Sequence, residues 1–304
     1  MLARLLRWVI LLQALAGAWL GWWLAGLLEW RVITGMVLAA GWALAMPFVV
    51  TALSVSLSLL RSRPSGSAAN WLRAGWGELG AAWQAFLLQQ PWVLLPPRVR
   101  LGRQDRLAVL LVHGYGCNHR VWDGLARRLD DAGHSVLSID LEPLFCSIDD
   151  YAPQIDEAVS LLCRATGAQQ VALVGHSMGG LAIRAWLRRF GHHRAAVVLT
   201  LGTPHAGTYM ARGAPTTNGR QMNWQSPWLQ ALAASEDTGT RRLMRLAWTR
   251  EDNIVYPQDQ QLLDGASQCR FDGIGHLQMT RNPDVGRWIL NELAGVTAQA
   301  RPSP

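Results

Sequence analysis

Two long runs of apolar residues dominate the beginning of the chain. Residues Trp8–Leu28 are apolar apart from Gln13, and residues Val32–Leu60 carry no charge. Each run is long enough to cross a hydrocarbon core of about 30 Å as a helix. Only Glu29-Trp30-Arg31 separates the two runs. The pattern therefore predicts a membrane hairpin of two transmembrane helices within residues 1–60.

A cleavable signal peptide is the alternative interpretation of the first run, because Arg4 and Arg7 precede it. The second and longer run follows at once, which argues against removal of the first. Glycine and alanine recur in both runs and permit close packing of the helices. Trp30, beside the predicted turn, suits the membrane–water interface. We therefore expect an intact hairpin.

Arginines flank the hairpin on its outer ends, whereas its turn has no net charge. By the positive-inside rule, both outer ends face the cytoplasm. The prediction is a protein of the cell (inner) membrane whose following domain lies in the cytoplasm. The flanking arginines are Arg4, Arg7, Arg61, Arg63 and Arg73.

Residues 61–97 differ in composition from the segments on either side. The stretch 61–70 is rich in serine and reads as a linker. Apolar residues then recur at alternating four- and three-residue intervals, which predicts an amphipathic helix. Its apolar stripe fits either packing on a folded domain or contact with a bilayer surface, and the sequence leaves both open. The stripe consists of Leu72, Trp76, Leu79, Trp83 and Phe86.

Short apolar runs and helix-like stretches alternate through residues 98–295. Ala108–Val112 is unbroken, as a strand buried on both faces should be. Val171–Val174 and Leu246–Trp248 are similar runs. For this region we expect an α/β domain with a mostly parallel, doubly wound sheet and helices on both faces. Residues 296–304 are expected to form a flexible tail.

The net charge of +7 and the pI near 10.0 raise the question of an anionic partner. The arginines are dispersed and no nucleic-acid recognition motif is present, so we expect an anionic membrane surface and no nucleic acid. The four cysteines have neither metal-ligand spacing nor a disulfide framework. We therefore expect no metal and no organic cofactor. The sequence carries no signal for the oligomeric state.

The pentapeptide Gly175-His176-Ser177-Met178-Gly179 follows one of the apolar runs and precedes a helix-like stretch. This is G-x-S-x-G in the strand–turn–helix context of a nucleophile elbow. Glycines at 175, 179 and 180 allow the strand and the helix to pass closely. Ser177 is therefore the predicted nucleophile.

A nucleophilic serine of this kind needs a histidine and an acid later in the chain. His276 lies in a glycine-rich loop after the strand-like segment 268–271. Asp252 follows an earlier strand-like run and is the predicted acid. Its neighbour Glu251 is the alternative, because a one-residue shift of the loop would exchange them. Asp272 is so close in sequence to His276 that it reaches the far ring nitrogen less easily.

Two backbone N–H groups should form the oxyanion hole. One belongs to Met178, the residue after the nucleophile, and the other to Tyr115 in the loop that follows the strand 108–112. Such donors stabilise charge that appears only in the tetrahedral intermediate. We expect His113, in the same loop, to be structural and to bond nearby backbone.

The stretch 106–293 resembles the α/β-hydrolase superfamily, specifically bacterial triacylglycerol lipases and esterases. This resemblance implies the α/β-hydrolase fold and the cleavage of carboxylic esters, whether lipid acyl esters or others. It also implies that Ser177, His276 and Asp252 carry out the reaction through an acyl-enzyme intermediate. Two alternatives stay open: an acyltransferase that uses the same residues, and a noncatalytic membrane scaffold on the same fold. The motifs that carry the resemblance are Leu-Val-His-Gly-Tyr-Gly at 111–116, Val-Gly-His-Ser-Met-Gly-Gly at 174–180, Leu-Gly-Thr-Pro-His-Ala-Gly at 201–207, Asp-Asn-Ile-Val at 252–255 and Gly-Ile-Gly-His at 273–276.

Residues 208–245 form a long insertion for a minimal hydrolase sheet. They could serve as a cap over Ser177, with Trp224 and Trp228 meeting acyl chains and arginines meeting headgroups. Helices that simply pack on the domain and expose a basic face explain the segment equally well.

Overall fold

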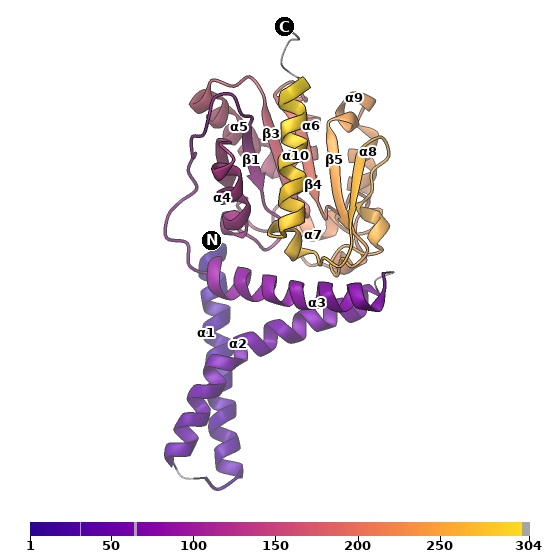
Figure 1. Ribbon diagram of the computed structural model, residues 1–304. Helices are drawn as coiled ribbons and strands as arrows, with labels where there is room; N and C mark the ends of the chain where they lie inside the picture. The colour runs from indigo at the N-terminus through magenta and orange to yellow at the C-terminus, as the bar shows by residue number, and fades with distance from the viewer. Residues whose placement is uncertain (31, 64–65, 300–304) are drawn as a thin grey trace.

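The structure is a computed structural model that describes residues 1–30, 32–63 and 66–299. Two long helices, α1 (Leu2–Leu27) and α2 (Val32–Ser62), project from an α/β domain as a hairpin (Figure 1). Arg31 of the predicted turn, residues 64–65 of the predicted linker and residues 300–304 of the predicted tail lie outside the described residues.

The two hairpin helices approach each other closely through glycines. A Cβ atom at Gly17 would lie 2.3 Å from the carbonyl oxygen of Trp42, and one at Gly21 would lie 2.5 Å from that of Leu38. No larger residue fits either position without moving the helices apart. The predicted packing of the hairpin through small residues is therefore confirmed.

Both hairpin helices are long and apolar enough to cross a membrane. Only 17% of the most apolar stretch of each helix is buried, so neither is the core helix of a soluble domain. Large apolar side chains point outward along both helices, as Trp19, Ile33 and Leu44 do at 67%, 76% and 77% exposure. An apolar surface of this extent needs a cover other than water.

The third helix, α3 (Ala68–Trp83), lies across the hairpin directly beneath the α/β domain (Figure 1). It continues as the π-helical segment η1 (Gln84–Gln89). The buried face of this helix differs from the one that the apolar stripe predicts. Small residues, among them Ala74, Ala81 and Ala85, pack against the domain together with Glu78, whereas Leu72 and Trp76 of the stripe are exposed.

Part of the apolar stripe is covered by α2 rather than by the domain. The rings of Trp83 and Phe48 meet edge to face with centroids 5.6 Å apart, and the Trp83 indole N–H donates to the Phe48 carbonyl. Phe48 follows Pro47, which removes a backbone donor from the interior of α2. Figure 1 shows α2 bending along its length, so that its C-terminal part runs beneath α3.

A six-stranded parallel sheet forms the centre of the α/β domain. Its strand order is β2-β1-β3-β4-β5-β6, and every neighbouring pair is parallel. The predicted parallel, doubly wound sheet is confirmed. The strands are β1 (Ala108–Val112), β2 (Val136–Ile139), β3 (Val171–His176), β4 (Ala195–Leu201), β5 (Met244–Thr249) and β6 (Ser267–Phe271).

Helices cover both faces of the sheet, and the strands alternate their side chains between two apolar cores. In β1, Leu110 points into the core beneath α5 and α6, and Leu111 points into the opposite core beneath α4 and α10. The helices are α4 (Asp123–Asp131), α5 (Ala152–Thr166), α6 (Met178–Phe190), α7 (Thr217–Gln221), α8 (Pro227–Ala234), α9 (Thr238–Arg242) and α10 (Pro283–Gln299). Short 3-10 turns span His119–Trp122, Ile148–Tyr151, Tyr209–Ala211, Gln258–Gln261 and Leu277–Thr280.

Two predicted boundaries differ from the structure. Helix α10 extends to Gln299, so it enters the segment predicted as a flexible tail. The connection between α2 and α3 is shorter than the predicted linker, because Ser67 already caps α3 by accepting the backbone N–H of Asn70.

Candidate active site

Ser177 occupies a sharp turn between β3 and α6. Its backbone has φ 54° and ψ −126°, a strained conformation for a residue with a side chain. The flanking glycines permit the turn, because a Cβ at Gly175 would lie 2.6 Å from the nitrogen of Gly180, and one at Gly179 would lie 2.2 Å from the carbonyl oxygen of Val112. The local geometry is that of a nucleophile elbow.

His276 and Asp252 form a buried pair at the same edge of the sheet. His276 Nδ1 lies 2.8 Å from Asp252 Oδ2. The other carboxylate oxygen of Asp252 accepts the backbone N–H groups of Ile254 and Val255 at 2.8 and 2.7 Å. This arrangement assigns the Nδ1 proton to the bond with Asp252 and leaves Nε2 free to accept a proton.

The other two candidate acids lie in different surroundings. Glu251 is fully buried, but its Oε2 accepts hydrogen bonds from the Thr249 hydroxyl and from the Gly273 backbone. Asp272 is half exposed and pairs with Arg270 at 3.3 Å. Of the three acids, Asp252 is the one that contacts His276.

His176, the residue before Ser177, connects the elbow to the loop of His276. Its Nε2–H donates to the carbonyl oxygen of His276 at 3.1 Å, and the two imidazole centroids are 4.6 Å apart. Burial and the charge of His276 hold the pKa of His176 well below its ordinary value, so its ring is neutral. This role is not evident from the sequence, because the second position of G-x-S-x-G is unrestricted.

The Ser177 hydroxyl forms no direct hydrogen bond with any described residue. Bonds of this kind are often long before substrate binds, so the geometry of the elbow and of the His276 loop is the relevant observation. Gly202, which directly follows β4, lies against the His276–Asp252 pair, since a Cβ there would lie 3.1 Å from His276 Nδ1 and 3.2 Å from Asp252 Oδ2. Its φ of +55° also favours glycine.

The Tyr115 and Met178 backbone N–H groups both lack an acceptor within the described residues. The loop that carries Tyr115 approaches the elbow closely, because a Cβ at Gly114 would lie 2.8 Å from the Cβ of Ser177. Among the described residues, neither N–H group is thus occupied, and the loop that carries Tyr115 lies beside the elbow.

His113 is structural, as predicted. Its Nδ1 lies 2.9 Å from the Gly114 carbonyl, and its Nε2 accepts the Leu141 backbone N–H at 3.0 Å. Burial lowers the pKa of His113, which keeps the ring neutral. The ring therefore fastens the Tyr115 loop to the loop that follows β2.

Glu78 of α3 reaches the loop of the candidate histidine. Its two carboxylate oxygens accept the backbone N–H groups of Leu277 and Gln278, both at 3.0 Å. Burial opposes protonation of His276, but the charges of Asp252 and Glu78 outweigh it and raise the pKa of His276 above its ordinary value. Burial also raises the pKa of Glu78, against the effect of His276 and the two N–H groups. Glu78 lies outside the apolar stripe and in no recognisable motif, so the sequence alone does not identify it as part of the site.

Helix α2 supports the same loop through Asn253. The Asn253 side chain donates to the Ser58 hydroxyl of α2 at 2.7 Å, and its oxygen accepts the His276 backbone N–H at 3.2 Å. Gln258 donates to the Ser62 carbonyl of α2 at 3.2 Å. The N-terminal helices therefore touch both loops that carry the histidine and the acid.

The segment 208–245 packs into the domain at several points. Met222, Leu229 and Leu232 belong to the apolar core beneath α5 and α6. Arg184 on the helix after Ser177 is fully buried and forms a two-bond ion pair with Glu236. The segment is thus anchored to the helix that follows the elbow.

Trp224 and Trp228 occupy different positions in this segment. Trp228 donates to Asp149 and lies beneath the Arg188 guanidinium, so it is structural. Trp224 is 36% exposed and packs edge to face on Tyr209, with ring centroids 4.8 Å apart. A second partly exposed aromatic pair consists of Tyr115 and Phe145, whose rings are tilted relative to each other with centroids 5.6 Å apart.

Nothing in the described residues forms a group of three or more His, Cys, Asp or Glu side chains that could hold a metal ion. The four cysteines are free, and burial raises the pKa of the Cys117 thiol to about 12. None of them lies in surroundings that favour a reactive thiolate.

Residues 109–299, well over half of the chain, match the family model described as "Alpha/beta hydrolase family". The chain belongs to the alpha/beta hydrolase family. The family resemblance expected from the motifs is thus confirmed. The match covers the sheet from Val109 onward, the candidate nucleophile and the His276 loop. It does not cover α1, α2 or α3.

Curated proteins resemble a smaller part of the chain. A triacylglycerol lipase of Pseudarthrobacter phenanthrenivorans is 34% identical over 115 residues, which is 35% of this chain and 35% of that protein. A triacylglycerol lipase of Burkholderia plantarii is 34% identical over 115 residues, 35% of this chain and 32% of that protein. The chain therefore spans about a third of the length of these relatives.

Solved structures share the fold. The mature Bacillus licheniformis lipase BlEst2 superimposes with a TM-score of 0.57 at 15% identity, over 68% of this chain and 97% of that one. Aspergillus fumigatus lipase B does so with a TM-score of 0.56 at 15% identity, over 64% of this chain and 56% of that one.

Proposed function

We propose that the protein is a membrane-anchored serine hydrolase that cleaves carboxylic esters, with lipid acyl esters as the favoured class. The observation that carries the proposal is the buried His276–Asp252 pair beside a serine on a strained, glycine-flanked elbow. The names of the relatives, which are triacylglycerol lipases, support the substrate class.

In the proposed mechanism, His276 Nε2 accepts the Ser177 proton while the hydroxyl oxygen attacks the ester carbonyl carbon. Asp252 holds the ring in the required tautomer and stabilises the imidazolium. The Tyr115 and Met178 N–H groups stabilise the oxyanion. His276 then gives the proton to the departing alcohol, which leaves an acyl group on Ser177. Water, deprotonated by His276, releases the acid and restores the serine.

The anchor in this proposal is the α1–α2 hairpin. Its outer faces are apolar, and its free end projects away from the domain (Figure 1). Both outer ends meet the domain, since Leu2 is buried there and Ser58 bonds to Asn253. The arginine distribution favours a domain on the cytoplasmic side of the cell membrane.

Fluorophosphonate labelling tests the chemistry, followed by turnover of a panel of esters with increasing acyl length. Parent protein should be labelled and should hydrolyse esters, and Ser177→Ala should lose both activities while keeping its circular dichroism. Ser267→Ala is the matched control, because Ser267 is exposed on β6. Near-parental turnover by a folded Ser177→Ala variant would exclude the proposal.

A further inference from the structure

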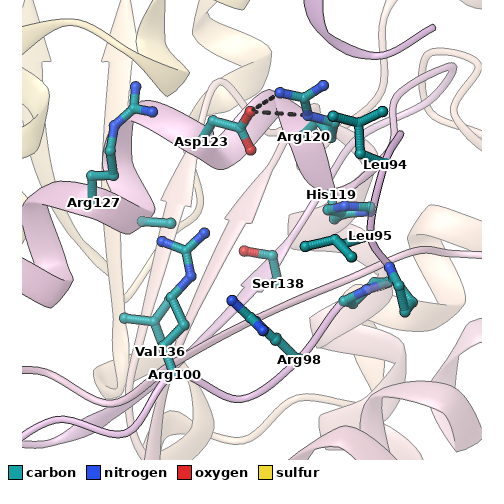
Figure 2. A pocket seen from close by; sticks show the side chains of 13 residues that line it. Leu94, Leu95, Arg98, Arg100, His119, Arg120, Asp123, Arg127, Val136 and Ser138 are labelled. Carbon is teal, nitrogen blue, oxygen red and sulfur yellow. Dashed lines mark hydrogen bonds and ion pairs between the residues drawn. The ribbon is translucent and has the colours of Figure 1, made fainter. Parts of the chain in front are cut away.

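A second concave site lies at the edge of the sheet, away from the candidate triad. The cavity has a volume of about 350 Å³ and lies between the segment 94–100, strand β2 and the start of α4. None of its lining residues belongs to the Ser177–His276–Asp252 group. Four arginines line the cavity, and Figure 2 labels each of them. They are Arg98, Arg100, Arg120 and Arg127.

The side chain of one of these arginines already binds other groups of the protein. Arg120 donates twice to Asp123, at 3.0 and 2.9 Å, and once each to the carbonyls of Gln89 and Trp92. His119, also in the lining, is held by Asp140 at 3.0 Å. The acidic groups near the cavity are therefore engaged.

The other three arginines have no acidic partner. Among the described residues, the side chains of Arg98, Arg100 and Arg127 form no ion pair and no hydrogen bond. Figure 2 shows the Arg98 and Arg100 guanidinium groups near each other and near Ser138 of β2, whereas the Arg127 side chain extends away from them. Arg98 and Arg100 are like charges at the same part of the cavity, and such charges repel one another unless an anion lies between them. Guanidinium groups match the oxygens of a phosphate in particular, because each can donate two parallel hydrogen bonds.

The remaining wall of the cavity is apolar and open. Leu94 and Leu95 are 87% and 61% exposed, and Pro96 and Pro97 continue the wall. These four residues also line a neighbouring cavity that includes Met1, at the start of α1. The cationic site therefore borders the point at which the proposed anchor meets the domain.

We propose that this pocket binds a phosphate group, with the headgroup of an anionic phospholipid as its source and Leu94 and Leu95 in contact with the adjoining apolar part of the lipid. The choice of a membrane lipid as the source rests on the proposed membrane anchoring. The binding of a phosphate group rests on the arginines alone. A lipid held here would fix the tilt of the domain on the bilayer surface.

Binding is measured on full-length Ser177→Ala protein in neutral detergent, so that no lipid is turned over. The probes are short-chain phosphatidic acid, phosphatidylcholine with the same chains, and inorganic phosphate, each followed by the shift in Tm. Phosphatidic acid should raise Tm saturably and phosphatidylcholine should not. The triple variant R98Q/R100Q/R127Q should weaken the phosphatidic acid response at least about tenfold, as the loss of charged hydrogen bonds implies.

Two further variants distinguish specific phosphate binding at these arginines from nonspecific attraction by the net positive charge of the protein. The control R164Q/R189Q/R242Q removes the same number of charges from other surfaces and should bind as the parent does. The variant R98K/R100K/R127K keeps the charge but should bind more weakly, because lysine lacks the planar fork. Equal binding by parent and R98Q/R100Q/R127Q, or an equal loss in the control, would overturn the proposal.

The same titrations identify the source of the phosphate. Tighter binding of phosphatidic acid than of inorganic phosphate supports a membrane headgroup, and equal binding supports a free phosphate at the same arginines. Ester hydrolysis by the corresponding variants on the Ser177 background is measured separately. Loss of phosphate binding with intact hydrolysis is the expected result for the R98Q/R100Q/R127Q substitutions, whereas absence of hydrolysis in the parent would contradict the proposed function and leave the phosphate-binding result unchanged.

Discussion

The Glu78 carboxylate accepts the backbone N–H of Leu277 at 3.0 Å, across 199 positions of the chain. Leu277 directly follows the candidate base, His276. Glu78 belongs to α3, which lies outside the part of the chain that matches the hydrolase family. A helix beside the proposed anchor is thus bonded to the loop that carries the candidate catalytic histidine.

We expect Glu78→Gln to shift the pH dependence of ester hydrolysis. His276 must be neutral to accept the serine proton, so kcat/KM rises as pH increases through its pKa. Asp252 and Glu78 raise that pKa above its ordinary value, so kcat/KM of the parent should rise at a correspondingly higher pH. Removing the charge of Glu78 lowers the pKa, and the acid limb should move to lower pH.

The same variant should also be less stable, by about 1–3 kcal/mol in the free energy of unfolding, because the glutamine NH₂ cannot accept the second N–H. Glu157→Gln, an exposed carboxylate on α5, is the control and should change neither property. If the acid limb of Glu78→Gln coincides with that of the parent, Glu78 has only a structural role, whatever the stability of the variant.

Asp252→Asn should reduce catalysis, whereas Glu251→Gln should mainly reduce stability. Asp252 bonds to His276, so its amide would hold the ring in the wrong tautomer and reduce kcat by about 10⁴-fold. Glu251 bonds to Thr249 and Gly273, so its loss should lower Tm and leave kcat/KM within about tenfold of the parent.

Asp272→Asn, which affects only a half-exposed pair with Arg270, serves as the control for both variants. Steady-state kinetics and thermal unfolding are recorded for all three proteins. An inactive Glu251→Gln variant beside an active Asp252→Asn variant would reverse the assignment of the acid.

Gly202→Ala should impair catalysis although it replaces none of the candidate catalytic side chains. The added Cβ would lie 3.1 Å from His276 Nδ1, at a φ of +55° that alanine adopts poorly. Because small displacements of catalytic groups are costly, we expect kcat/KM to fall about 100-fold. Gly124→Ala is the matched control, since a Cβ there meets nothing within 4 Å. Equal kinetics for the two variants would refute the tight contact.

The topology prediction is that the chain enters the membrane twice and leaves the domain in the cytoplasm. Reporters fused after Pro304 test it, one active only after export and the other only in the cytoplasm. We expect the cytoplasmic reporter to be active and the protein to stay in membranes after carbonate washing. Activity of the exported reporter would reverse the orientation, and release by carbonate would remove the anchor from the proposal.

The sequence alone determined the elements that depend on local pattern. Unbroken apolar runs such as Ala108–Val112 identify strands that are buried on both faces, and that pattern needs no knowledge of the partner strand. The glycines around Ser177 identify the elbow, because only they allow the strand and the helix to approach so closely. The apolar hairpin helices were equally visible, since their length and composition are properties of contiguous residues.

Tertiary structure decided the features in which neighbouring residues take different partners. Glu251 and Asp252 are adjacent, acidic and buried, yet they point to Gly273 and His276 respectively, which only the path of the loop determines. Helix α3 packs by its alanines rather than by its tryptophans, because close contact between a helix and a domain requires small side chains. A hydrophobic pattern indicates that a residue will be covered, but it does not specify whether a protein domain, another helix or a membrane provides the cover.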